Sequence, residues 1–134
     1  MRAVVVDAPG DPNQMTIRDI DRPEPGPHEV RIRVKTTALN RADTYQRRGH
    51  YPPPEGAPDT LGLEAAGTVD AVGAEVAEWN PGDRVCALLP GGGYAEYAVV
   101  HAGHVLPVPK NTSWEQAAAF PEVFLTAFQA LHWL

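Results

Sequence analysis

The stretch EVRIRVKTTALNRADTYQRRGHYPPP, residues 29–54, passes from a strand pattern into a cluster of polar side chains. Residues 29–39 alternate apolar with charged side chains, which predicts a strand with Val and Ile on one face and Arg and Lys on the other. Residues 40–48 then predict one short helix, with Asn40 as N-cap and Gly49 at the C-terminal end. So many hydrogen-bonding groups in one connection indicate either a solvated surface helix or one wall of an active site.

Length and charge narrow the class of protein. The chain has 134 residues, enough for one domain with a single core, and a formal net charge of -6. This acidic balance argues against a nucleic-acid partner, which would require basic patches. The absence of an 18-residue apolar run argues against a membrane span, and the first apolar run is too short for a signal peptide. The single cysteine, Cys86, fits a reducing compartment and a buried position, so we expect a cytoplasmic protein.

Turn residues are frequent and spread along the chain, with 14 prolines and 12 glycines. This pattern predicts a mainly β fold, a small β-barrel of short strands with short helices. Within it, Gly62 and Gly67 indicate close approaches of backbone to backbone. Besides 29–39, strands are expected at residues 2–7, 15–20, 60–73, 85–90, 94–100 and 104–110.

The last quarter of the sequence changes from strand to helix patterns. NTSWEQAAAF (111–120) has capping-box spacing twice, and PEVFLTAFQALHWL (121–134) predicts a helix with a wide apolar side that includes Leu134. We therefore divide the chain into a barrel at 1–110 and the start of a helical connection at 111–134, and we expect the chain to continue. The exposed aromatic residues of this helix should promote self-association; they are Phe124, Phe128 and Trp133.

Three kinds of site are disfavoured by their surroundings. His101 and His104 have HxxH spacing but flank a glycine between two strands, without a neighbouring Cys or carboxylate at ligand spacing. The glycines at 91–93 lead into a strand instead of a helix N-terminus, which favours a flexible loop beside a cleft over a phosphate cradle. Ser113, the one serine, is explained by helix capping, which argues against acyl transfer.

The polar helix by itself favours the plainer interpretation. Arg41 with Tyr45, and Asp43 with Arg47, are spaced four residues apart and share helix faces. Such pairs are typical of a solvated helix with one ion pair. Tyr51, in the Pro-rich loop that follows, is equally explained by a ring packed on prolines.

Five blocks of sequence, taken together, point to a known family. In their order and spacing they resemble the zeta-crystallin-like NADPH:quinone oxidoreductases, on the zinc-free side of the medium-chain dehydrogenase/reductase superfamily, and the LLPGGG variant is most similar to the stress-inducible quinone reductase branch. The blocks are ALNRADTYQRRGHYPPP (38–54), LGLEAAGTV (61–69), GDRV (82–85), LLPGGGYAEY (88–97) and QAAAFPEVFLTAF (116–128).

The resemblance implies a GroES-like barrel followed by a Rossmann domain that would bind most of the NADPH beyond Leu134. It implies no zinc, because Asn40 and Leu63 stand where zinc-dependent relatives have a Cys and a His, and the structural zinc cysteines are missing. Without the second domain we expect little or no turnover. A homodimer is expected for the full-length protein, together with a small-molecule quinone substrate, no nucleic-acid partner and no membrane partner.

The resemblance also implies roles for individual residues. Hydride passes from reduced nicotinamide to an electron-poor quinone carbon, and donors stabilise the negative charge that develops on a carbonyl oxygen. Water can supply the proton, so no acid with a strongly shifted pKa is needed or evident. Glu64 is interpreted as a buried structural carboxylate bonded to backbone amides in preference to a catalytic group. The implied site residues are Asn40, Tyr45 and Tyr51 as catalytic, Asp43, Gly92 and Gly93 as substrate-binding, and Asn40 and Thr126 as cofactor-binding.

Three other classes of protein remain compatible with the sequence. A GroES-like co-chaperonin has the same fold, but the sequence offers no mobile loop with an aliphatic anchor. A structural role, as a dimerisation or lens-crystallin-type protein, is a second alternative. The third is a zinc-free reductase of the same superfamily that acts on enones or enoyl thioesters.

Overall fold

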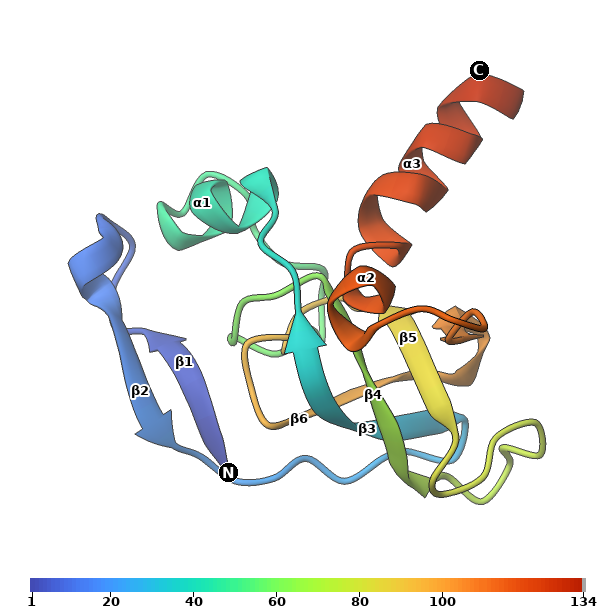
Figure 1. The fold of residues 1–134 in the computed structure, drawn as a ribbon. Helices are drawn as coiled ribbons and strands as arrows, with labels where there is room; N and C mark the ends of the chain where they lie inside the picture. Colours follow the sequence, from blue (N-terminus) through green and yellow to red (C-terminus); the bar gives the residue numbers. More distant parts are fainter. Residues whose placement is uncertain (134) are drawn as a thin grey trace.

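The computed structural model describes residues 1–133, and Figure 1 shows their arrangement. A curled five-stranded antiparallel sheet has the strand order β6-β3-β4-β5-β7, and a separate ribbon pairs β1 with β2. This confirms the mainly β expectation. The strands are β1 (Arg2–Val6), β2 (Met15–Asp19), β3 (Glu29–Thr37), β4 (Glu64–Val72), β5 (Arg84–Leu88), β6 (Tyr97–His101) and β7 (Val105–Pro107).

The core lies against the concave side of the five-stranded sheet. Val30 and Ile32 of β3 have no exposed surface, as their alternation with charged residues predicted. They pack with Val85 of β5 and Val100 of β6, which are equally buried or nearly so. Burial of such side chains stabilises by roughly 1.5–3 kcal/mol each, so these residues contribute substantially to the stability of the sheet.

Helices sit at one end of the sheet. They are α1 (Arg41–Arg47), α2 (Trp114–Ala118) and α3 (Pro121–His132), with short 3-10 turns at Pro12–Gln14 and Ala102–His104. A capping box begins α2, because Gln116 N–H donates to Ser113 Oγ at 3.2 Å and Ser113 N–H donates to Gln116 Oε1 at 3.0 Å. Of the two capping boxes that the sequence allowed, this is the one formed. Buried Ala117 and Ala118 bring α2 onto the sheet beside Cys86.

Several strands are shorter than the sequence predicts, and two of them begin three or four residues later than expected. The strand expected from residue 60 begins at Glu64, because Thr60–Gly62 carbonyls instead accept hydrogen bonds from the glycine loop. The strand expected from residue 94 begins at Tyr97, and before it Ala95 forms a single bridge with Ala3. The first difference arises because residues 60–62 pair with the glycine loop, and the second because residues 94–96 pair with β1 and β3.

Arg31 departs from the solvated position expected for its face of β3. Its side chain is 7% exposed and pairs with Glu24 and Asp70, each at 2.7 Å, while donating to Pro23 O at 3.1 Å. The proline-rich segment before β3 therefore folds over this face of the strand. Alternation predicts which face a side chain takes, but it does not predict what covers that face.

The close approaches predicted at Gly62 and Gly67 are confirmed. A Cβ on Gly67 would lie 2.1 Å from Arg33 O on the paired strand. A Cβ on Gly62 would lie 2.7 Å from Tyr94 N, and Gly62 also has φ +106°. Gly62 thus lets the segment before β4 run directly against the loop at 91–94.

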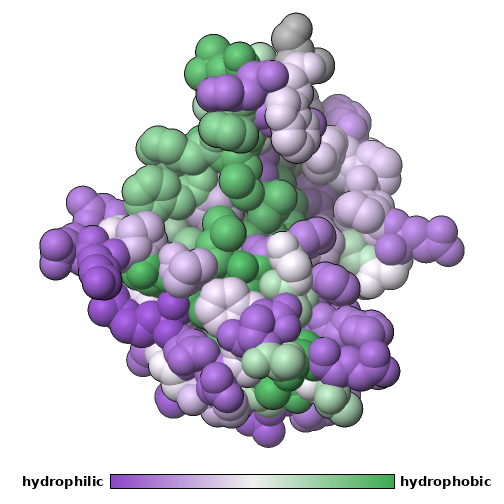
Figure 2. Space-filling model, turned by 90° about the vertical axis from the view of Figure 1, so that its right-hand side faces the viewer, coloured by the Kyte–Doolittle hydropathy of each residue, from purple (hydrophilic) through white to green (hydrophobic). Residues whose placement is uncertain are grey.

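α3 extends away from the rest of the molecule (Figure 1), and hydrophobic residues gather there in Figure 2. Within residues 1–133, no helix is long and apolar enough to cross a membrane. The predicted exposure of aromatic residues is confirmed, and self-association stays a prediction; Leu134 lies outside the described residues. The exposed large side chains are Val123, Phe124, Leu125, Phe128, Leu131 and Trp133.

Candidate functional site

Asn40 joins two buried carboxylates where β3 ends and α1 begins. Its backbone N–H donates to Asp43 Oδ2 at 2.7 Å, and its side-chain Nδ2 donates to Glu64 Oε1 at 2.8 Å. Asn40 is the N-cap of α1, as predicted, so its backbone leaves the strand and turns the side chain toward β4. Nδ2 carries two hydrogens and Glu64 takes one, which leaves a second N–H for a ligand.

Tyr94 connects the glycine loop to the same cluster. Its hydroxyl donates to Asp43 Oδ2 at 2.7 Å. Burial is the first cause that raises the pKa of Tyr94, followed by the hydrogen bond to Asp43 and the charges of Asp43 and Glu64. Tyr94 is therefore a protonated hydrogen-bond donor over the ordinary pH range. Asp43 Oδ1, by contrast, is buried without a hydrogen-bond partner.

Glu64 closes the network against α3. It is 1% exposed, and its second oxygen, Oε2, accepts from Glu122 N–H at 2.8 Å. The expectation of a buried carboxylate bonded to backbone amide is confirmed for this oxygen, while the other oxygen binds the Asn40 side chain. One carboxylate thus fixes the start of α3 relative to the start of α1.

The cluster carries negative charge without a cation. Among residues 1–133, no Lys, Arg or His forms an ion pair with Asp43, Glu64 or Glu122. Burial, and then the charges of Glu64 and Asp43, raise the pKa of Glu122. The buried carboxylates are therefore held by neutral hydrogen-bond donors, the Asn40 amide, the Tyr94 hydroxyl and the Glu122 backbone N–H.

The two predicted catalytic tyrosines lie outside this network. Tyr45 is 39% exposed, and its hydroxyl accepts from Arg41 Nη2 at 3.2 Å, which confirms that these two share a helix face. Tyr51 is 48% exposed in the irregular segment after α1. The predicted pair of Asp43 with Arg47 does not form in the described part of the chain, because Asp43 turns inward to Tyr94. Both tyrosine roles stay predictions.

The glycine loop is more ordered than the flexible loop that its composition suggests. All three glycines are buried, Gly92 N–H donates to Thr60 O at 2.7 Å, and Gly93 N–H donates to Gly62 O at 3.0 Å. These amides are occupied, so a substrate-binding role for Gly92 and Gly93 would depend on the shape of the loop. Gly93 lines one pocket and Gly92 lines a second one, and their substrate-binding role stays a prediction.

Thr126, the other predicted cofactor contact, lies one turn along α3 from Glu122. Its hydroxyl donates to Glu122 O at 2.7 Å, which leaves its oxygen able to accept from a ligand. Thr126 is exposed, and it lies on the same helix whose first turn touches Glu64.

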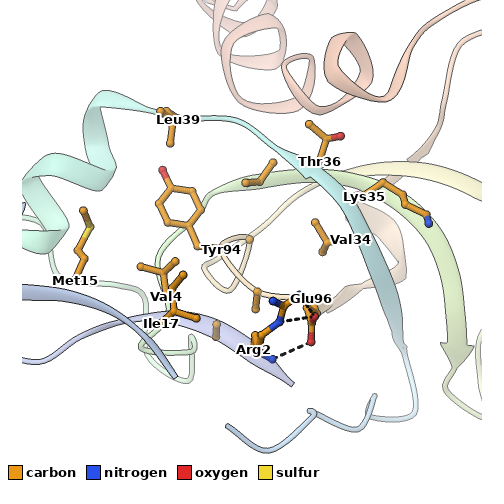
Figure 3. A pocket seen from close by; sticks show the side chains of 14 residues that line it. Arg2, Val4, Met15, Ile17, Val34, Lys35, Thr36, Leu39, Tyr94 and Glu96 are labelled. Atoms are coloured by element: carbon orange, nitrogen blue, oxygen red, sulfur yellow. Dashed lines mark hydrogen bonds and ion pairs between the residues drawn. The ribbon is translucent and has the colours of Figure 1, made fainter. Parts of the chain in front are cut away.

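A pocket of about 530 Å³ adjoins the network between the β1–β2 ribbon and the end of β3. Figure 3 shows the Tyr94 ring on one side of it and the Arg2–Glu96 ion pair, at 2.9 Å, toward one end. This volume lies within the usual range for ligand sites. Its lining is mainly apolar, from Val4, Met15, Ile17, Val34, Leu39 and Tyr94.

Tyr94 and Glu122 are the site residues that sequence reasoning missed. Both stand inside blocks that carried the resemblance, but their side chains gave no local signal of their own. The sequence pattern predicts a strand at Tyr94 and the first turn of a helix at Glu122. Their roles depend on contacts with Asp43 and Glu64, which are 51 and 58 residues away in sequence.

The histidines and the cysteine do not join the cluster as metal ligands. His101 Nδ1 accepts from Gly103 N–H at 3.1 Å, and the rings of His101 and His104 are 6.0 Å apart. Residues 1–133 contain no group of three or more His, Cys, Asp or Glu arranged to hold a metal ion. Cys86 is buried, as expected, and burial followed by the charge of Glu64 raises the pKa of its thiol.

Comparison with known proteins gives concordant matches. The model of the alcohol dehydrogenase GroES-like domain matches residues 26–110. A quinone oxidoreductase from Pseudomonas aeruginosa is 46% identical over 111 residues, covering 82% of this chain and 34% of that protein. Trans-enoyl reductase tazE from Aspergillus terreus is 36% identical over 140 aligned residues, covering 96% of this chain and 46% of that protein.

Solved structures agree with the sequence matches. The Escherichia coli quinone oxidoreductase complexed with NADPH superposes with a TM-score of 0.90 at 32% identity, over 99% of this chain and 41% of that one. The chain therefore spans between about a third and a half of the length of these relatives.

Proposed function

The chain belongs to the alcohol dehydrogenase GroES-like domain family, and from this premise we propose that it is the catalytic domain of an NADPH-dependent quinone oxidoreductase. The observation that carries the proposal is the Asn40 amide, held by Glu64 with one N–H left to donate. The quinone oxidoreductases among the relatives support the substrate class, and the NADPH complex of one of them supports the cofactor.

The residues at the site fit a nicotinamide. Its carboxamide N–H group needs an acceptor, which Thr126 Oγ1 can provide, and in the proposal the one free N–H of Asn40 is shared between the carboxamide oxygen and the developing quinone oxyanion. NADPH, when bound, supplies a hydride. In this proposal a second, nucleotide-binding domain holds the remainder of the cofactor, so the chain at 134 residues has little or no turnover.

Substrate activation falls to hydrogen-bond donors of this chain. As the quinone accepts a hydride, negative charge develops on a carbonyl oxygen, and fixed donors aimed at that oxygen lower the barrier. The Asn40 amide is one donor, and the exposed hydroxyls of Tyr45 and Tyr51 are two others that a bound substrate can reach. Asp43 and the loop with Gly92 and Gly93 shape the substrate side.

Reduction of an enoyl thioester is the second candidate, favoured by the similarity to a trans-enoyl reductase. The two reactions share hydride transfer and a developing oxyanion, so the same donors would serve both. They differ in the shape of the acceptor, since a planar quinone does not require a channel for a long thioester.

The proposal also covers the oligomeric state, the cellular compartment and the metal content of the intact enzyme. The intact enzyme is a cytoplasmic homodimer that works without zinc. Asn40 and Leu63 offer no thiolate or imidazole at the positions where zinc-dependent relatives bind metal.

A chimera tests the proposal directly. This chain replaces the aligned segment of the Pseudomonas aeruginosa relative, and NADPH oxidation is followed with 1,2- and 1,4-quinones, with enones, and with an enoyl thioester. We expect quinone-dependent oxidation by the chimera and almost none by the 134-residue chain.

Variants assign the donors. Asn40→Ala and Tyr51→Phe should lower kcat by about tenfold or more, in line with the loss of one oxyanion donor. Tyr97→Phe, which removes a hydroxyl from β6 next to Arg22, is the matched control and should change little. A chimera that reduces enoyl thioesters but no quinone would transfer the assignment to the second candidate.

A further inference from the structure

The Tyr94 hydroxyl reaches Asn40 through a single carboxylate oxygen. Asp43 Oδ2 accepts from the Tyr94 hydroxyl at 2.7 Å and from the Asn40 backbone N–H at 2.7 Å. Asp43 is buried, so water does not readily take the place of either donor. One oxygen therefore joins the end of the glycine loop to the residue whose side-chain amide serves the proposed reaction.

The position of the Tyr94 ring is fixed by the two loops that meet there. Its backbone N–H donates to Leu61 O at 2.9 Å, and its carbonyl oxygen accepts from Val4 N–H at 2.9 Å. Gly62 leaves room for the ring, because a Cβ there would lie 2.7 Å from Tyr94 Cδ1. Figure 3 shows the ring directed toward Leu39, with the hydroxyl at its far end. A hydroxyl held in this way can orient another side chain without help from a ligand.

Arg47 is a competing partner for Asp43. It follows Asp43 by four residues on α1, a spacing that favours an ion pair, and both side chains are buried. The structure holds Asp43 on Tyr94 instead, and Asp43 Oδ1 has no hydrogen-bond partner. Without the Tyr94 hydroxyl, the carboxylate would keep only the Asn40 N–H and could turn toward Arg47. Such a turn would release the backbone of Asn40.

The direction of the Asn40 amide depends on where its backbone lies. Nδ2 donates one hydrogen to Glu64 Oε1 at 2.8 Å, and the second hydrogen is the donor that the proposed reaction uses. A donor stabilises an oxyanion only if it already points at the place where the charge develops. A displacement of about 1 Å at a reacting group can lower a rate by about a hundredfold. A residue that fixes the Asn40 backbone can therefore alter the barrier without touching the substrate.

We propose that Tyr94 is a positioning residue for Asn40 and acts through Asp43, an inference that rests on the proposed function. Its hydroxyl keeps Asp43 on the Asn40 N–H and away from Arg47, so the second hydrogen of the Asn40 amide stays directed at the developing oxyanion. The backbone amides of the glycine loop are occupied. The loop then serves the reaction by placing the Tyr94 hydroxyl.

The side-chain amide signals of Asn40 test the positioning without turnover. In the ¹⁵N-labelled 134-residue chain, the two hydrogens should have well-separated ¹H shifts, because only one of them is bonded to Glu64. Tyr94→Phe should narrow this separation, and adding Arg47→Gln should restore it by removing the competing cation. Tyr97→Phe, which removes a hydroxyl from β6, is the matched control and should leave the signals as in the parent. Asn40 signals that are the same in Tyr94→Phe and in the parent overturn the proposal.

The chimera tests the effect on catalysis. Tyr94→Phe should lower kcat by about tenfold and change KM by less than about twofold, because the Asn40 donor acts on charge that develops in the transition state. In the Asn40→Ala background the same substitution should change kcat by less than about twofold, since the group that it positions is gone.

Two kinetic results would refute the positioning role alone. An active chimera that is indifferent to Tyr94→Phe is one of them. The other is an equal loss of kcat in both backgrounds, which is what a merely structural role or a direct contact with the substrate predicts. A chimera inactive with every quinone refutes the proposed function instead, and the amide signals then still decide whether Tyr94 holds Asn40.

Discussion

Asn40→Ala removes the side chain that donates a hydrogen bond to the buried carboxylate of Glu64. The variant keeps the backbone N–H that donates to Asp43, but Glu64 Oε1 loses the donor that lies 2.8 Å away. Glu64 is 1% exposed, so water cannot easily replace the amide. Its other oxygen keeps the Glu122 N–H. The variant therefore removes one hydrogen bond to a buried carboxylate oxygen together with the N-cap side chain of α1, and the double variant described below separates the two effects.

The expected loss of unfolding free energy is about 2–3 kcal/mol. A hydrogen bond to a charged group contributes about 1.5–3 kcal/mol, and leaving a buried acceptor unpaired costs its desolvation. Glu64→Gln should cost less, about 1 kcal/mol, because the carbonyl of the introduced amide can still accept from Glu122 N–H. The Asn40 amide can then turn over and accept from the new NH₂ group. The charge that needed the donor is also gone.

Urea denaturation followed by tryptophan fluorescence measures both variants and the double variant. Asn40→Ala should cost at least about 1 kcal/mol less in the Glu64→Gln background than in the parent, which is the coupling expected of residues in contact. The Asn40 amide does not donate to Glu64 if the free energy of unfolding of Asn40→Ala lies within about 0.5 kcal/mol of the parent value, or if the substitution costs the same in both backgrounds. The basis for its placement at the site would then be lost.

Three other changes have expected outcomes by the same assay. Gly62→Ala, whose Cβ would lie 2.7 Å from Tyr94 N, should cost about 3 kcal/mol or more, whereas Gly82→Ala, with a similar φ of +97° but no atom within 4 Å, should cost about 1–2 kcal/mol. Tyr94→Phe should cost about 1–3 kcal/mol, because Asp43 Oδ2 loses a donor while Oδ1 has none. The fold raises the pKa of Tyr94, so the parent should lose stability above about pH 10. Tyr94→Phe should abolish this loss. The fold likewise raises the pKa of Glu122 and holds its proton more tightly than the unfolded chain does. Parent stability should thus decline as pH rises from the ordinary Glu pKa, and Glu122→Gln should gain over the parent above that window but not below it. Equal pH profiles for parent and variant would contradict the assignment in either case.

The strands were predictable because their pattern is local. Alternation at period two placed Val30 and Ile32 in the core, and turn residues bounded most strands within a few positions. The errors fall where backbone groups find partners far away in sequence, as at residues 60–63 and 94–96. The backbone at 60–62 pairs with the glycine loop and that at 94–96 pairs with β1 and β3, and neither set of partners can be read from the local residues.

The candidate site was predictable in part. A polar segment after an apolar strand indicated Asn40 and Asp43, and the structure brings both into one network with Glu64. The sequence did not indicate Tyr94 and Glu122, because each joins the network by a hydrogen bond to a residue more than 50 positions away. The burial of these carboxylates without a counter-ion arises only in the folded protein, so the apolar and polar pattern of the sequence does not predict it.

The buried carboxylates of Asp43 and Glu64 lower the stability of the fold, and this suggests that they have a role beyond packing. Buried carboxylates without a cation destabilise a fold, and apolar residues of similar size at such positions are often neutral or stabilising. Here Asp43 even keeps one buried oxygen without a donor. The network nevertheless joins the starts of α1, β4 and α3 to the glycine loop through Asn40 and Tyr94. A cluster that needed only to hold these elements together would be better served by a cation at its centre. Acids held by neutral donors instead leave the site without a fixed cation, so the donors themselves, such as the Asn40 amide, are the groups that it offers to a developing negative charge.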